Sequence, residues 1–274
     1  MLLHIQKTFL FFAVLISAFG LIACNDDASI IPDPIIIPET GKMAIEFDNI
    51  VGNKNLVLDG FTYANTAGES FKISKFNYFI SNIKLTHENG NIYTVPQDSS
   101  YFLVKEDTKA SQIITLNHVP SGTYKYLEFM IGIDSLRNTM DVKKRTGVLD
   151  PANGEGMDWA WNSGYIFTKL EGTFTTLADS TGDFKYHVGL YGGYIEPTVN
   201  NTRIVKIPFG ELKAAVSASK TPQVHLMVDV LKFLNGSGTN LQFKDNSSIM
   251  GANQSLSKMV ADNYAQMFTV DHIH

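Results

Sequence analysis

Short segments in which hydrophobic and polar residues alternate make up most of this chain. Alternation with a period of two, together with many β-branched and aromatic residues, is typical of half-buried β-strands. The pattern predicts strands at residues 43–47, 55–58, 71–85, 92–95, 101–105, 111–116, 122–133, 165–175, 184–190, 202–209 and 223–231. Turn-forming residues such as Glu88-Asn89-Gly90 separate them. About ten short antiparallel strands indicate an all-β fold, a β-sandwich or a barrel.

Helical spacing of hydrophobic residues is rare in this sequence. Residues 255–267 place Leu256, Val260 and Tyr264 on one helical face, behind possible capping residues at positions 253 and 255. A second short helix is predicted at residues 210–218. No repeat or change of composition divides the remaining chain, so we expect one domain over residues 42–274, with one or two short helices.

The N-terminal segment has a different pattern. An almost unbroken apolar run over residues 9–22 follows Lys7. The run is shorter than the ~20 residues that a membrane-spanning helix needs, and it fits the hydrophobic region of a secretory signal. It ends in Leu21-Ile22-Ala23-Cys24, which resembles a bacterial lipobox. The alternative is an uncleaved membrane anchor with an incidental cysteine.

These features predict three parts of the chain. Residues 1–23 form a lipoprotein signal peptide, and residues 24–41 form a lipidated N-terminus with a Pro-rich linker. Residues 42–274 form the folded domain. We therefore expect an outer-membrane lipoprotein that is attached through a lipid on Cys24 and faces the periplasm or the cell surface.

Composition excludes several functions. The chain has 274 residues, a net charge of −5 and no basic block, so we expect no nucleic-acid partner. Its one cysteine excludes a disulfide framework and a zinc site built from several cysteines. The motifs of hydrolases, metalloproteases and phosphate-binding loops are absent, so we expect no enzymatic activity.

Histidines are the strongest candidates for binding chemistry. His187 and His225 lie inside predicted strands, and His225 shares a strand face with Met227. His272 and His274 share a face if the chain around them is extended. Imidazole and thioether groups in a thiol-free domain suit copper, above all Cu(I). The alternative is that these are ordinary strand histidines without a ligand.

Both tryptophans lie in one short segment. If it is extended, Met157, Trp159 and Trp161 line one face. Such a face is a plug in the core or a platform for carbohydrate stacking.

Several blocks of the sequence together resemble a known family. They are Met157-Asp158-Trp159-Ala160-Trp161-Asn162-Ser163-Gly164-Tyr165, Lys169-Leu170-Glu171-Gly172, Tyr186-His187-Val188-Gly189, Val224-His225-Leu226-Met227-Val228-Asp229 and the closing Phe268-Thr269-Val270-Asp271-His272-Ile273-His274. The combination resembles the MbnP-like copper-binding family, the methanobactin-associated protein and its bacterial lipoprotein relatives.

The resemblance implies an all-β domain outside the cytoplasm that binds copper through histidines. His187, His225 and His272 match the family's histidines, with Met227, His274 and Met157 as further candidates. In characterised members a partner di-haem enzyme oxidises a tryptophan to kynurenine, which joins the copper site. The matching residues here are Trp159 and Trp161, and the implied partners are a di-haem peroxidase-like enzyme and an outer-membrane transporter.

The sequence departs from the family at two places. Phe47-Asp48-Asn49 stands where the family's first strand often has a histidine, and Trp-x-Trp-Asn replaces the Trp-x-His arrangement of the better known relatives.

Two alternative functions remain open. One is a metal-free module that presents an aromatic surface to a glycan or an outer-membrane partner; the residues concerned are Tyr63, Trp159, Trp161, Tyr165, Tyr191 and Tyr194. The other is calcium binding by loop carboxylates at Asp134, Asp150 or Asp158, without EF-hand spacing. The copper prediction requires His187, His225 and His272 to converge.

Overall fold

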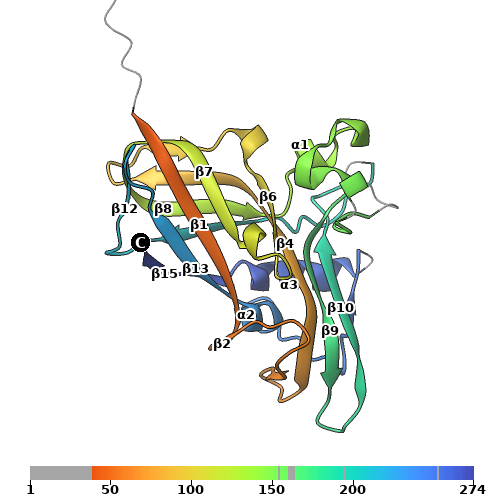
Figure 1. Cartoon of the computed structure of the whole chain (residues 1–274). Helices are drawn as coiled ribbons and strands as arrows, with labels where there is room; N and C mark the ends of the chain where they lie inside the picture. The colour runs from red at the N-terminus through yellow and green to blue at the C-terminus, as the bar shows by residue number, and fades with distance from the viewer. Residues whose placement is uncertain (1–38, 154, 160–163, 194, 252) are drawn as a thin grey trace, which may run out of the picture. The chain divides into compact units, whose positions relative to one another are not determined.

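The computed structural model describes residues 39–153, 155–159, 164–193, 195–251 and 253–274. The predictions for the signal peptide, Cys24, Trp161 and Tyr194 lie outside these residues, as does nearly all of the predicted linker. The described part folds as two β-sheets with a few short helices (Figure 1).

The first sheet has five strands, and its order places strands from both ends of the described chain side by side. The order is β15 (Phe268–Ile273), β13 (Gln223–Asp229), β1 (Thr40–Val51) and β2 (Lys54–Asn55), with β7 (Ile113–Pro120) also paired to β1. In Figure 1 these strands run from the red N-terminal β1 to the blue β15.

The second sheet has ten strands and is built around the long strand β4. The order is β11 (Arg203–Pro208), β8 (Gly122–Ile131), β4 (Ser70–His87), β9 (Ile166–Thr175), β10 (Thr181–Gly189) and β14 (Ser248–Ile249), with β3 (Tyr63–Ala64), β5 (Ile92–Thr94), β6 (Tyr101–Lys105) and β12 (Ala214–Val216) paired at its sides.

The helices are short and lie between strands. The α-helices are α1 (Ser135–Asn138), α2 (Val230–Leu234) and α3 (Gln254–Tyr264), and the 3-10 turns are η1 (Gln97–Ser99), η2 (Lys109–Gln112), η3 (Val142–Lys144), η4 (Gly147–Leu149) and η5 (Pro151–Asn153). None of the helices in the described residues is long and apolar enough to cross a membrane.

The two sheets pack face to face through an aromatic core. Phe47 on β1 points inward because side chains alternate along a strand. Its ring makes edge contacts with those of Tyr78, Phe129 and Phe268, at centroid distances of 6.2, 5.9 and 6.2 Å. These contacts join strands of both sheets, so the all-β fold predicted from alternation, a sandwich or a barrel, is confirmed.

A second, smaller core covers another part of the ten-stranded sheet. The segment between β8 and β9 folds back so that Met157, Trp159 and Tyr165 are buried beside Phe79 and Phe167. The tryptophan segment is therefore a core plug in its described part.

The structure differs from the sequence prediction in three details. β1 and β13 pair in parallel, as do β10 and β14, so the sheets are mixed rather than antiparallel throughout. The helix predicted at residues 210–218 is wrong, because Ala214–Val216 forms β12 and pairs with Gly122–Tyr124 of β8. The strand predicted at 223–231 ends at Asp229, whose carboxylate accepts a hydrogen bond from the Leu231 N–H and caps α2.

The helix prediction at 255–267 is confirmed as α3, which ends at Tyr264.

Candidate metal centre

The outer face of β13 carries the candidate residues in the five-stranded sheet. Val224, Leu226 and Val228 are fully buried in the core. His225 and Met227 alternate with them and lie on the opposite face, half-buried. The strand therefore places its polar residues on the outside of the sandwich.

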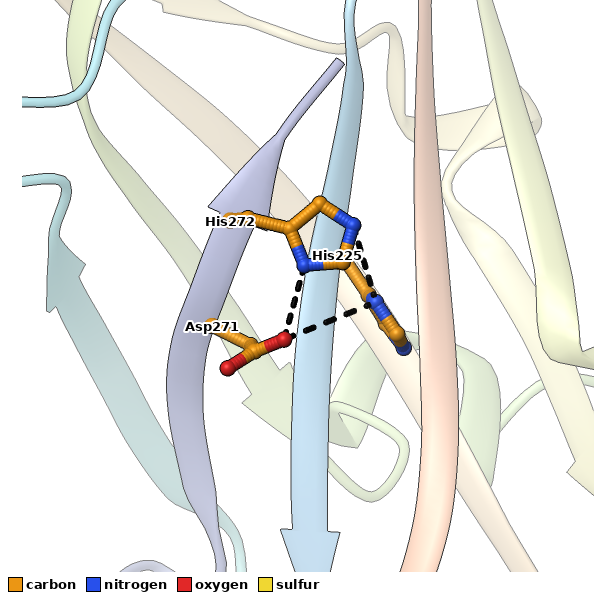
Figure 2. A group of neighbouring side chains, drawn as sticks. All are labelled: His225, Asp271 and His272. Atoms are coloured by element: carbon orange, nitrogen blue, oxygen red, sulfur yellow. Dashed lines mark hydrogen bonds and ion pairs between the residues drawn. The ribbon is translucent and has the colours of Figure 1, made fainter.

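A bulge in β15 brings two side chains next to His225. His225 pairs with His272 but Leu226 pairs with Val270, so Asp271 is an extra residue in β15. Bulges of this kind change the direction in which side chains point. Both Asp271 and His272 consequently reach His225, as Figure 2 shows.

Three imidazole rings lie in a row at this place, with His272 in the middle. Nδ1 of His225 lies 3.4 Å from Nε2 of His272, and Nε2 of His272 lies 2.7 Å from Nε2 of His274. The backbone holds His274 in position, since its N–H donates to the Gln223 carbonyl at 3.0 Å and its own carbonyl accepts from the Gln223 N–H. We call His225, His272 and His274 the three-histidine cluster.

Two carboxylates flank the cluster. Oδ2 of Asp271 lies 2.7 Å from Nδ1 of His272 and 4.0 Å from Nδ1 of His225. Oδ2 of Asp48, on β1, lies 3.4 Å from Nε2 of His225. Nε2 of His225 is buried and makes no hydrogen bond. Its polar neighbour is the Asp48 carboxylate, at ion-pair distance.

The ligand types of the cluster suit a transition-metal ion. Imidazole nitrogens bind copper and zinc at about 2.0–2.1 Å, so ligand nitrogens of one ion lie roughly 3 Å apart. Among the described residues, only His225, Asp271 and His272 bring three metal-binding side chains within 4.8 Å of one another. His274 contacts His272 but is not part of this group. Asp271 contacts Nδ1 of His272, whereas Nε2 is the nitrogen that faces His225. We therefore interpret Asp271 as a residue that orients a ligand and not as a ligand.

His187 does not join the cluster. It lies on β10 in the ten-stranded sheet, where its Nε2 contacts Oε1 of Glu171 at 2.6 Å. Burial lowers the pKa of His187, and the hydrogen bond to Glu171 opposes this shift. His187 lies in a different sheet from His225 and His272 and is not in their group of metal-binding side chains, so the expected convergence of the three is not seen in the described residues.

The other predicted site residues are distributed between the two sheets. Met227 shares the outer face with His225 but lies one row further along, opposite Asp48 and Thr269. Met157 and Trp159 are buried in the second core. The Trp159 ring lies against Gly189 of β10, where an added Cβ would come within 2.8 Å of it.

The alternative sites find no support in the described residues. Tyr63, Trp159 and Tyr165 are buried, so they do not form an aromatic surface. Asp134 caps α1 and accepts hydrogen bonds from Tyr101 and Asn82, and it forms no group with other carboxylates.

Sequence reasoning missed the two flanking carboxylates. Asp271 directly precedes the predicted ligand His272, so its proximity was a usable signal. Asp48 had no such signal, because the parallel pairing of β1 with β13 joins residues about 180 positions apart.

A family model described as MbnP matches residues 40–251. The chain belongs to the MbnP family. The match contains Trp159, His187 and His225, whereas α3 and β15 lie beyond its end, so His272 and His274 are outside it.

The fold also matches that of a solved MbnP structure. MbnP from Methylosinus trichosporium superposes with a TM-score of 0.52 and 16% sequence identity, over 79% of this chain and 82% of that chain. The likeness shows a shared fold. No curated protein matched the sequence.

Proposed function

We propose that this member of the MbnP family binds copper through the three-histidine cluster, as a bacterial lipoprotein attached to the outer membrane at Cys24. The observation that carries the proposal is that Nε2 of His272 lies 3.4 Å from Nδ1 of His225 and 2.7 Å from Nε2 of His274, on the outer face of the five-stranded sheet. His225 and His272 would hold the ion, with His274 beside them as a further candidate.

Three arguments support copper as the metal. Imidazole nitrogens are good ligands for copper, which exceeds zinc in affinity for a given nitrogen site. The resemblance of this sequence to the copper-binding family points to the same metal. The single cysteine lies at position 24, so the described domain has no thiol to compete for a soft metal.

Copper titration of purified full-length protein tests the proposal. We expect one copper ion per chain in wild type. Mutation of a residue that only supports a metal ligand typically weakens binding by about 10–100-fold. Since His225 supplies a ligand nitrogen itself in this proposal, His225→Ala should weaken copper binding by more than that. Equilibrium competition with a chelator of known affinity measures this.

His187→Ala is the matched control, because it removes a strand histidine from the other sheet. It should leave stoichiometry and affinity unchanged. The assignment of the site would be wrong if His187→Ala abolished binding and His225→Ala did not, and the function would be wrong if wild type bound no copper.

A further inference from the structure

The ten-stranded sheet carries a cavity of about 530 Å³ on its outer face. The walls come from β4, β5, β8, β11 and the start of α1, and none of the lining residues belongs to the three-histidine cluster. Pockets that bind small molecules in proteins measure about 300–1,000 Å³. The cavity therefore has room for a small molecule, separate from the candidate metal centre.

A bulge in β4 forms one wall of the cavity. The pairing of β4 with β8 shifts after Ser81, and Asn82 lies in this bulge with a φ of 53°. Asparagine tolerates this left-handed conformation better than most residues. Bulges change the direction in which side chains point, and the Asn82 amide donates a hydrogen bond to Oδ2 of Asp134 at 3.0 Å.

Neutral donors hold the half-buried carboxylate of Asp134, which also lines the cavity. Oδ2 accepts hydrogen bonds from the Tyr101 hydroxyl at 2.6 Å and, more weakly, from the Gln97 amide at 3.5 Å. Oδ1 accepts one from the Arg137 N–H at 3.1 Å. Burial raises the pKa of this carboxyl, but the hydrogen bonds outweigh burial and leave the pKa below its ordinary value. Asp134 is therefore ionised at neutral pH.

The charge of Asp134 is not balanced by an ion pair. Lys84, which also lines the cavity, pairs with Glu128 at 3.0 Å, and the Arg137 guanidinium pairs with Asp98. None of the ion pairs between described residues includes Asp134. A half-buried carboxylate attracts a cation more strongly than an exposed one, because the surrounding dielectric constant is lower. The cavity is thus suited to a ligand that brings a positive charge.

Apolar side chains form much of the remaining wall. Leu136 of α1 and Ile204 of β11 are each 54% exposed although both are large and hydrophobic. Val95, Pro96 and Met130 line the cavity with them. Removing such apolar surface from water is favourable, so a ligand with an apolar body would gain free energy by covering it.

We propose that this cavity binds a small organic ammonium ion, with the ammonium group on the Asp134 carboxylate and an apolar body against Leu136 and Ile204. A carboxylate offers about four acceptor positions, and Oδ1 uses one of its own for the Arg137 N–H. Hydrogen bonds between two charged groups are about twice as strong as those between neutral groups. A neutral or anionic molecule of the same shape would lose this bond.

Three probes of one shape and different charge test the proposal in the full-length chain. They are phenylbutylammonium, phenylbutanol and phenylbutyrate. Ligand-observed NMR titrations at neutral pH, without added metal, give the affinity of each probe. We expect the ammonium probe to bind at least about tenfold more tightly than the other two.

Asp134→Asn removes the charge and keeps a good capping residue for α1. It should weaken binding of the ammonium probe by about tenfold and leave that of the alcohol unchanged. Asp141→Asn is the matched control and should change neither, since Asp141 is an exposed capping residue that does not line the cavity. Leu136→Ala should weaken all probes alike, by about threefold, because it removes apolar contact only.

Equal affinities of the three probes would overturn the proposal, as would an unchanged affinity in Asp134→Asn or a wild type that binds none of them. Displacement of the ammonium probe by an equal concentration of calcium chloride would assign Asp134 to a metal ion instead and would also overturn it. The comparison of the probes in wild type does not depend on the folding of any variant. Copper binding by the three-histidine cluster is tested independently of all these outcomes.

Discussion

Two strand histidines of this protein differ because of what each ring nitrogen touches. Nε2 of His187 is engaged by Glu171 at 2.6 Å, on the sheet that carries the second core. Nδ1 of His225 instead faces another imidazole. The same residue type in the same kind of element therefore contacts a carboxylate in one sheet and another imidazole in the other.

The pH dependence of stability should report the burial of His187. Burial lowers the pKa of this ring, against the opposing hydrogen bond from Glu171, so the unfolded state takes up a proton before the folded state does as the pH falls. The contribution to stability is complete above about pH 6.5, the ordinary histidine value, and decreases below it until the folded ring is protonated too. Urea denaturation at a series of pH values measures this.

The variant His187→Gln should lose that part of the pH dependence, because glutamine has no titrating group. His118→Asn is a suitable control, since His118 is exposed and its φ of 57° is one that asparagine tolerates. Identical pH profiles for wild type and His187→Gln would show that His187 does not cause the pH dependence of stability.

At the scale of elements, alternation in the sequence is enough to predict most strands. β6 coincides with the predicted segment, and β13 and β15 expose the predicted histidines. Alternation does not reveal which strands pair. The parallel contact of β1 with β13, which supplies Asp48, and the pairing that turns residues 214–216 into β12 are both decided by tertiary contacts between distant segments.

Strand β1 should be the element on which stability depends most visibly. Phe47 is fully buried and contacts aromatic rings from both sheets. Phe47→Ala removes these contacts and leaves a cavity, so we expect a loss of about 3–5 kcal/mol in the free energy of unfolding. Chemical denaturation monitored by circular dichroism measures this loss.

The control for that prediction is Ile92→Ala on β5, where the side chain is 63% exposed and its removal should change stability by less than about 0.5 kcal/mol. A similar loss in both variants would mean that the contacts between the two sheets contribute little.

At the scale of the whole molecule, the two sheets separate two groups of residues that the sequence suggested as one site. Trp159 and His187 belong to the ten-stranded sheet and its second core. The three-histidine cluster belongs to the five-stranded sheet. Sequence blocks show residue types and spacing, and only the pairing of strands shows which blocks meet.

The proposed attachment of the whole molecule to a membrane depends on Cys24. A lipidated protein should partition into the detergent phase of a bacterial extract, with a mass that reflects loss of residues 1–23 and addition of lipid. Cys24→Ala should abolish the lipid mass and leave an uncleaved precursor. Recovery of the wild type as an uncleaved, unmodified chain would contradict the lipoprotein proposal.

The parallel pairing of β1 with β13 also bears on folding kinetics. β1 is the first strand of the described chain, and its partner follows about 180 residues later. Contacts between such distant positions close a large loop, so they slow folding. Until β13 and β15 are in place, one edge of β1 stays unpaired, and an open edge of this kind promotes aggregation. The three-histidine cluster joins residues of β13 and the end of the chain, so it is complete only once β13 and β15 have paired.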